Sequence, residues 1–391
     1  MNRAVLFIAI AMLTGGISEG MFINFQPIYL QQMGADSFRI GVLLSGFGLM
    51  MAVSPIPAGY FADRYGRKPL IAFAWMLGTG AVWIMALAQS LSIFVIGMLL
   101  YGVTNFVSSP LNSYVTVARG RWSVGRMFTL VSASFNLGMV IGPCLGGWIG
   151  EQIGLRQNFF IAAGILMVST LFILFIQPQS IDQPSQGGVD EHPLQNTRYM
   201  IYLAALFLMV FALYLSQPLS PNFLQNERGL NLGQIGQLYS LSGIGVVILN
   251  ITLGSLQART GIVLAQISVL IFCLFLWLGD DIFAYIIGYF LLGGFKTARV
   301  LGSALTREFV PKTKMGLAFG LSETVSSFGL LLAPLLAGYL YSKNPIWMYM
   351  MSVGLILLSL VVSFRFLPAA GRASHPIHPS AEDVNEYPET R

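Results

Sequence analysis

The chain has 391 residues, of which 55% are hydrophobic and only 9% are charged, and its mean hydropathy is +0.72. These values exclude an ordinary soluble globular domain and indicate a protein that folds in lipid. The formal net charge of +5 follows from membrane topology and gives no reason to expect a nucleic-acid partner.

Apolar stretches of about 20 residues, long enough to cross a hydrocarbon core of about 30 Å, recur along the whole chain. They predict an all-α integral membrane protein and leave no room for a folded soluble domain. The twelve predicted transmembrane helices are 5–32, 38–62, 69–89, 93–117, 127–150, 157–176, 199–226, 232–257, 262–280, 281–309, 314–341 and 345–366.

Basic residues are distributed unevenly between the two ends of these predicted spans. Of the 21 Lys and Arg residues, fifteen fall on one side and four on the other. Because short basic loops stay cytoplasmic, both termini of the chain are predicted to be cytoplasmic. The compact loops predict a multi-pass protein of a cell membrane and fit a bacterial inner membrane.

The two halves of the sequence repeat each other in order. At an offset of 195 residues Gly41 matches Gly236, and at an offset of 191 residues Gly147 matches Gly338. Parallel repeats of six spans predict two bundles related by a pseudo-twofold axis along the membrane normal, with a solute site in a central cavity between them.

The polar segments outside the spans set the predicted domain limits. Residues 1–176 form the N-terminal six-helix bundle, and residues 199–368 form the C-terminal one. The polar stretch 177–198 is predicted to be a flexible cytoplasmic linker, and residues 369–391 a disordered cytoplasmic tail.

Two short motifs resemble a known family. Residues 59–68, GYFADRYGRK, resemble the loop motif G-x-x-x-D-R-x-G-R-K of the major facilitator superfamily, at the expected turn between spans 2 and 3. Residues 138–147, GMVIGPCLGG, resemble the fifth-helix motif of the drug/proton antiporter branch. The resemblance implies a twelve-helix secondary transporter. Met98 departs from it, since proton antiporters of this type often carry an Arg at that position.

Each motif also has a physical interpretation. Asp63 is placed to meet the positive N-terminal end of the helix at 314–341, which would help to close the cytoplasmic side. In the second half Ala258 replaces this acid, so the latch is one-sided. The predicted cytoplasmic gate comprises Gly59, Asp63, Arg64, Gly66, Arg67 and Lys68.

The helix-5 motif is rich in small residues at helical spacing. Glycines four residues apart predict a flat face that lets another helix approach closely, and the proline predicts a bend. The residues of this motif are Gly138, Gly142, Pro143, Gly146 and Gly147.

Four ionisable side chains fall inside predicted spans, where each charge costs at least about 2.5–3.5 kcal/mol on insertion scales. Helix rise places Glu19 and Lys296 about 20 Å from the cytoplasmic end, on different bundles. Arg299 and Glu323 lie about 14 Å deep on neighbouring helices. The matched depths predict pairing: Arg299 with Glu323 in a structural or functional ion pair, and Glu19 with Lys296 across the cavity in one state.

Uncharged polar residues recur at helical spacing on the same spans, which predicts polar faces turned toward a wet cavity. With the four charged residues they form the predicted substrate or ion pathway. These uncharged residues are Gln26, Asn105, Ser108, Asn112, Ser132, Asn136 and Gln217.

The sequence favours a secondary active transporter that works by alternating access. It contains no P-loop and no histidine within a span, so neither ATP hydrolysis nor catalysis is expected, and no cofactor or metal. The favoured function is proton-coupled export of an amphiphilic or drug-like small molecule by a monomer in the lipid bilayer. One alternative is a carrier of an organic anion or metabolite that uses Lys296 and Arg299, and another is a non-transporting membrane receptor or scaffold.

Overall fold

The computed structural model describes residues 3–55, 66–118, 123–178, 197–309 and 315–367. Throughout these residues the regular structure is helical, without a β-strand. In the first half the elements are α1 (Arg3–Phe22), η1 (Ile23–Phe25), α2 (Gln26–Gln32), α3 (Ser37–Val53), α5 (Arg67–Leu87), α6 (Leu91–Val103), η2 (Thr104–Val107), α7 (Ser108–Ala118), α8 (Val124–Ile153) and α9 (Leu155–Leu174).

The second half has the same order of long helices. Its elements are α10 (Thr197–Tyr214), α11 (Ser220–Asn226), α12 (Leu232–Gly254), α13 (Ala258–Leu278), α14 (Ile282–Leu292), α15 (Gly294–Leu305), η4 (Thr306–Glu308), α16 (Met315–Lys343) and α17 (Trp347–Phe366).

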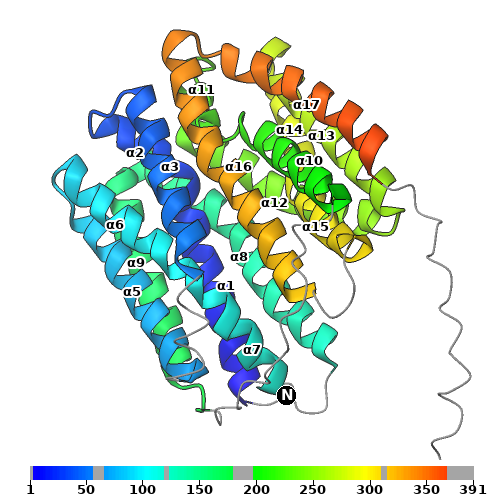
Figure 1. Cartoon of the computed structure of the whole chain (residues 1–391). Coiled ribbons are helices and arrows are strands. Elements are labelled where there is room, and N and C mark those ends of the chain that lie inside the picture. Colours follow the sequence, from blue (N-terminus) through cyan, green and yellow to red (C-terminus); the bar gives the residue numbers. More distant parts are fainter. Residues whose placement is uncertain (1–2, 56–65, 119–122, 179–196, 310–314, 368–391) are drawn as a thin grey trace, which may run out of the picture.

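Ten stretches within the described residues are long and apolar enough to cross a membrane. The shorter apolar helix α3 and the consecutive pair α14 and α15 complete the twelve predicted spans. The chain is therefore a multi-pass membrane protein with two six-helix bundles, the N bundle (α1 to α9) and the C bundle (α10 to α17), which lie side by side in Figure 1.

Several predicted spans are broken within the membrane-crossing stretch. The span predicted at 199–226 ends its first helix at Tyr214 and resumes at Ser220, because Pro218 cannot donate the backbone hydrogen bond that a continuous helix needs. The span predicted at 281–309 breaks at Gly293, where a side chain would collide with the backbone of Gly245 on α12.

The two bundles touch along two helix pairs, α3 with α16 and α8 with α12. A Cβ atom built on Gly41 would lie 2.9 Å from the Cα of Gly338, and one built on Gly147 would lie 3.0 Å from the Cα of Gly236. Real Cβ atoms do not approach other backbones so closely, so only glycine permits these crossings. The internal repeat exchanges the two contacts, as a pseudo-twofold axis requires.

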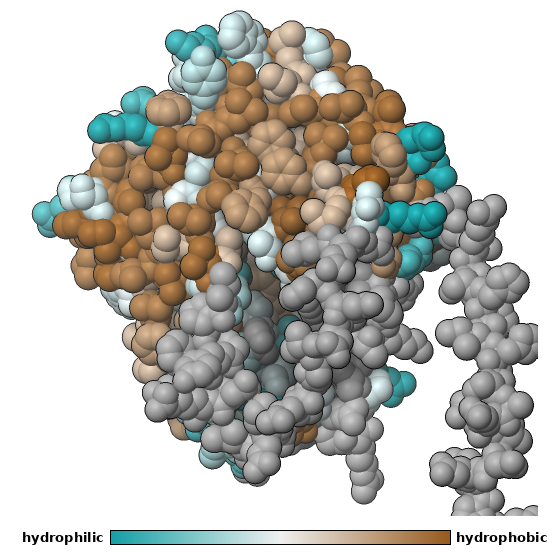
Figure 2. Space-filling model, viewed as in Figure 1, coloured by the Kyte–Doolittle hydropathy of each residue, from teal (hydrophilic) through white to brown (hydrophobic). Residues whose placement is uncertain are grey.

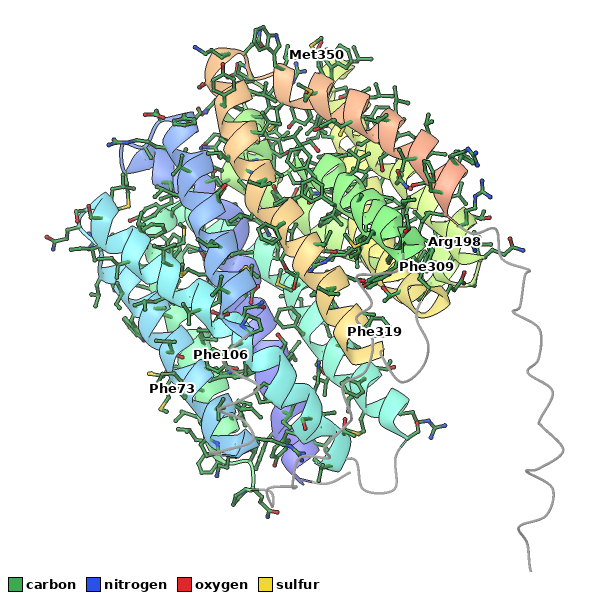
Figure 3. The ribbon with its side chains drawn as sticks, viewed as in Figure 1. Phe73, Phe106, Arg198, Phe309, Phe319 and Met350 are labelled. Carbon is green, nitrogen blue, oxygen red and sulfur yellow. The ribbon has the colours of Figure 1, made fainter. Side chains whose placement is uncertain are left out.

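The two bundles are joined at one end of the molecule, and the surface between them is hollowed toward the other end. We call the end where α1 begins the N face and the other end the opposite face; Figure 3 shows Met350 of α17 at the opposite face and Phe319 of α16 nearer the N face. At the opposite face the bundles are joined by polar contacts: the Asn222 side-chain amide donates to the Pro27 carbonyl (3.1 Å), and the Leu232 amide donates to Glu151 (2.9 Å). Figure 2 shows the surface hollowed between the bundles toward the N face.

Candidate functional site

Glu19 lies on α1, in the N bundle, and is half-buried. Its carboxylate accepts a hydrogen bond of 2.9 Å from the hydroxyl of Tyr101 on α6. The Tyr101 ring packs edge-on against Phe22, with centroids 5.1 Å apart and an interplanar angle of 82°. The hydrogen bond and the ring contact together fix the direction in which the carboxylate points.

Lys296 lies in the first turn of α15, directly after the break at Gly293, and its side chain is exposed. Within the described part of the chain it makes no hydrogen bond or ion pair. Its charge interacts electrostatically with those of Glu19 and Arg299. Glu19 and Lys296 are therefore near each other, on different bundles, but are not in contact in this conformation.

Arg299 and Glu323 form an ion pair between α15 and α16, as their matched depths predict. Their side chains are 30% and 57% exposed, so the pair borders open space and is not enclosed in a dry core. Next to it, the Tyr214 ring stacks on Phe295, with centroids 5.5 Å apart and an interplanar angle of 25°. Tyr214 is also close enough to Arg299 to interact electrostatically with it.

The predicted polar residues of the N bundle make local hydrogen bonds and stay accessible. Asn105 donates to the Met51 carbonyl on α3 (3.0 Å), and the hydroxyl of Ser108 donates to the Asn105 carbonyl (2.7 Å). Asn112 is exposed on α7. On α8, the half-buried Asn136 donates to the Ser132 carbonyl (2.8 Å) and, at 3.2 Å, to its hydroxyl.

Two other predicted residues have different surroundings. Gln217, in the break between α10 and α11, is half-buried and donates to the Leu213 carbonyl (2.7 Å). Gln26 is only 1% exposed, and its amide lies 3.9 Å from the Met85 sulfur on α5. The structure thus places Gln26 inside the N bundle, apart from the accessible polar residues.

The helix-5 glycines pack α8 against α1. A Cβ on Gly138, Gly142 or Gly146 would collide with the backbone of α1 at successive turns, from Leu13 to Met21. Gly147 faces the other way, toward Gly236 of the C bundle. Pro143 lies inside α8, next to Gly20 of α1. This motif therefore fixes the position of the helix that carries Glu19.

The predicted gate motif is only partly described. Gly59, Asp63 and Arg64 lie outside the described residues. Gly66 has a φ of 84°, a conformation that favours glycine, and it precedes α5, whose first two residues are Arg67 and Lys68.

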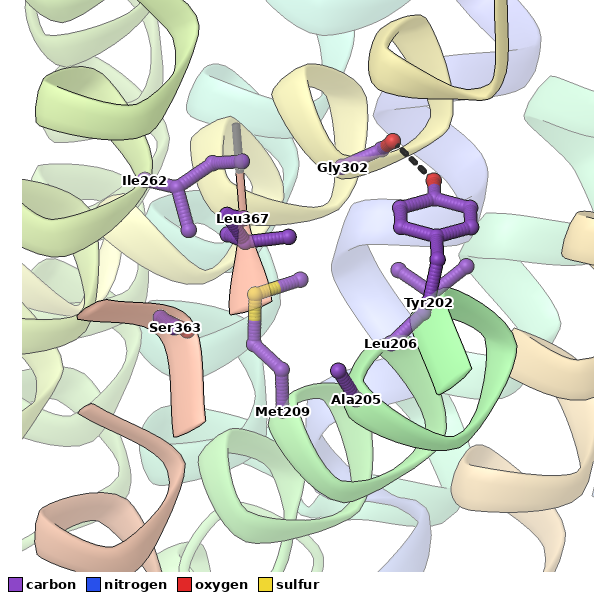
Figure 4. Close-up of a pocket in the computed structure, with 8 residues that line it drawn as sticks. All are labelled: Tyr202, Ala205, Leu206, Met209, Ile262, Gly302, Ser363 and Leu367. Atoms are coloured by element: carbon purple, nitrogen blue, oxygen red, sulfur yellow. Dashed lines mark hydrogen bonds between the residues drawn. The ribbon is translucent and has the colours of Figure 1, made fainter. Parts of the chain in front are cut away.

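A small pocket inside the C bundle was not predicted from the sequence. Figure 4 shows the Tyr202 hydroxyl donating to the Gly302 carbonyl at its edge. The pocket lies between α10, α13 and α15 and the end of α17. None of its described lining side chains is charged, so it is distinct from the charged centre formed by Glu19, Lys296, Arg299 and Glu323. Its lining residues are Tyr202, Ala205, Leu206, Met209, Ile262, Gly302, Ser363 and Leu367.

Comparisons with known proteins agree with this architecture. A family model described as Major Facilitator Superfamily matches residues 8–266 and 202–386, which together span most of the chain. The chain belongs to the Major Facilitator Superfamily. This superfamily member is thus a non-enzymatic transporter, with Glu19 on one bundle and Lys296 on the other.

Individual relatives are distant. This superfamily member is 24% identical over 360 residues to "Multidrug resistance protein 2" of Bacillus subtilis (strain 168), covering 83% of this chain and 85% of that protein. It is 24% identical over 384 residues to "Quinolone resistance protein NorA" of Staphylococcus aureus (strain COL), covering 92% and 94%. The solved structure of the nucleoside transporter NupG matches with a TM-score of 0.79 at 15% identity, covering 94% of this chain and 98% of that one.

Proposed function

We propose that this transporter is a proton-coupled exporter of amphiphilic, drug-like compounds that works by alternating access. The observation that carries the proposal is the placement of Glu19 and Lys296 on different bundles, within electrostatic reach but not in contact. The names of two relatives, a multidrug and a quinolone resistance protein, support export of such compounds.

The orientation of the chain in the membrane decides which side the open end of the molecule faces. The distribution of Lys and Arg supports cytoplasmic termini, and the compact loops fit a bacterial inner membrane. The N face is then cytoplasmic, so the hollow toward this face (Figure 2) opens inward. In that state a compound from the cytoplasm or the inner leaflet reaches the centre. The loop motif, with Asp63, Arg67 and Lys68, then closes this side when the bundles rock.

Opposite charges on the two bundles couple the binding of a proton or ligand to the change of conformation. When the bundles close and expel water from the centre, an ionised Glu19 and Lys296 attract each other far more strongly than in bulk solvent, and this stabilises the closed arrangement. A proton on Glu19, or a ligand bound to either group, removes the attraction. Occupancy of the centre thereby changes the balance between conformations, as coupled transport requires.

The direct test is flux into proteoliposomes whose outer surface carries the N face. An acidic lumen is expected to drive accumulation of an amphiphilic dye, and a protonophore to abolish it. Glu19→Gln and Lys296→Gln should each lose this coupled flux while inserting normally, with Glu308→Gln and Lys343→Gln as controls. Wild-type accumulation in both central variants, or accumulation that ignores the protonophore, would reject the proposal.

A second candidate is a carrier of organic anions, favoured by Lys296, which is exposed and has no ion-pair partner among the described residues. Arg299 gives it less support, because Glu323 already neutralises that charge. Electrogenic uptake of an anion, lost in Lys296→Ala, would favour this candidate over the first.

A further inference from the structure

The charges of the four ionisable side chains at the centre sum to zero, but one of these side chains has no hydrogen-bond or ion-pair partner among the described residues. Glu19 and Glu323 carry two negative charges, and Lys296 and Arg299 carry two positive ones. Arg299 is paired with Glu323, and Glu19 accepts the Tyr101 hydroxyl. Among these four, Lys296 alone makes no hydrogen bond or ion pair within the described part of the chain, and it is exposed. An acidic group on a bound ligand would supply the ion-pair partner that Lys296 lacks in this conformation.

The sign of the ligand's charge decides which exchange with protons is possible. A ligand with only a basic group binds Glu19 but is repelled by Lys296. A ligand with only an acidic group binds Lys296 best when Glu19 is protonated, so it travels with a proton. A ligand with both groups binds Lys296 and replaces the proton on Glu19, which is the competition that antiport needs. Tyr101, on α6, and Lys296, on α15, are the polar groups that interact with Glu19.

A half-buried tyrosine ring lies on each side of the centre. Tyr101 packs on the buried Phe22 and donates to Glu19, and Tyr214 stacks on the buried Phe295 and lies close to Arg299. An aromatic ligand therefore has a tyrosine ring to pack against in each bundle, and such contacts contribute beyond simple area burial.

We propose that the physiological substrates are aromatic zwitterions, whose basic group binds Glu19 and whose acidic group binds Lys296. The inference rests on the proposed export function and names the substrate class of that same site. It also assigns different tasks to the two charges: Glu19 exchanges the proton for the basic group, and Lys296 selects for the acidic group.

Equilibrium binding to the purified full chain tests this without flux. The probes are Nε-dansyl-lysine, its methyl ester and its Nα-acetyl derivative, which share one fluorophore and are a zwitterion, a cation and an anion. We expect the zwitterion to bind about tenfold more tightly than either derivative, as the loss of one charge-assisted contact predicts. Lys296→Gln should abolish the preference over the ester, and Glu19→Gln the preference over the acetyl form. Lys343→Gln and Glu308→Gln should keep both preferences.

Each outcome decides a separate question. Equal binding of the three probes, or preferences that survive in Lys296→Gln and Glu19→Gln, would overturn the zwitterion assignment even if proton-driven flux is present. Selective binding that depends on both residues, in a protein that shows no proton-driven flux, would support the assignment and reject the export function.

Discussion

Gly41 of α3 packs backbone to backbone against Gly338 of α16, and the internal repeat carries this contact onto Gly236 and Gly147. The two bundles therefore meet at two equivalent helix crossings, where glycines let the two backbones come into contact. Both crossings close the opposite face, whereas the molecule is hollowed toward the N face. In the proposed alternating-access cycle, rocking of the bundles would separate these glycine contacts.

Enlarging one glycine should hold the opposite face open. In Gly147→Leu, the new side chain would meet the backbone of Gly236 and force the bundles apart. We expect transport to fall about tenfold or more, and a cysteine introduced by Pro27→Cys to react faster with a membrane-impermeant maleimide. Pro27 is buried on α2, and its replacement keeps the backbone carbonyl that accepts from Asn222. Cys144 and Cys273 are first replaced by Ser. Gly164→Leu on α9, where a Cβ meets open space, is the matched control; unchanged labelling in Gly147→Leu would contradict the interface.

The amide contacts at the opposite face are expected to act as a clamp. Asn222 donates to the Pro27 carbonyl and, at 2.5 Å, to the Gln31 side chain. Asn222→Ala removes both bonds, at a cost of about 0.5–1.5 kcal/mol each. Spin labels on α2 and α11 should report a larger outward-open population in this variant. A distance distribution identical to that of the wild type would show that the clamp has no such role.

The Tyr101 hydroxyl is expected to orient the Glu19 carboxylate. Tyr101→Phe keeps the ring contact with Phe22 but removes a hydrogen bond to a charged group, which contributes about 1.5–3 kcal/mol. Proton-driven flux should fall at least several-fold while the variant still inserts and purifies as folded protein. If flux is unaffected, the hydrogen bond has no part in coupling.

A double-mutant cycle tests whether the Arg299 and Glu323 ion pair is structural or takes part in transport. Removing one partner leaves an unpaired charge beside open space, so Arg299→Gln and Glu323→Gln should each lower stability modestly. If the pair only joins α15 to α16, the double variant should recover both stability and flux. Recovery of stability without flux would assign the pair to transport itself.

Much of the architecture follows from apolar spacing alone. Runs of about 20 residues give the membrane spans, and the order of matched glycines gives the two bundles. The breaks after Tyr214 and at Gly293 were missed, because hydropathy continues across them while Pro218 and a close helix crossing interrupt the hydrogen bonding.

The site was only partly predictable because helical spacing shows which residues share a face but not what that face meets. Depth correctly paired Arg299 with Glu323. Helical spacing placed Gln26 in the predicted pathway, yet Gln26 is buried against Met85. Asn158 and Ser169 on α9 were not singled out, and they bind the Met21 and Ala11 carbonyls of α1. A polar side chain that joins two helices has the same sequence pattern as one that lines a cavity.

The central claim is that polar residues of both bundles surround one water-accessible centre. Its most direct measurement is labelling of the single-cysteine variants Glu19→Cys, Asn105→Cys and Lys296→Cys by a small water-soluble thiol reagent in intact membranes. Leu171→Cys, on the exposed apolar face of α9, is the lipid-facing reference. We expect the three central cysteines to react readily and the reference to stay unlabelled. Labelling of all three as slow as the reference would contradict the account.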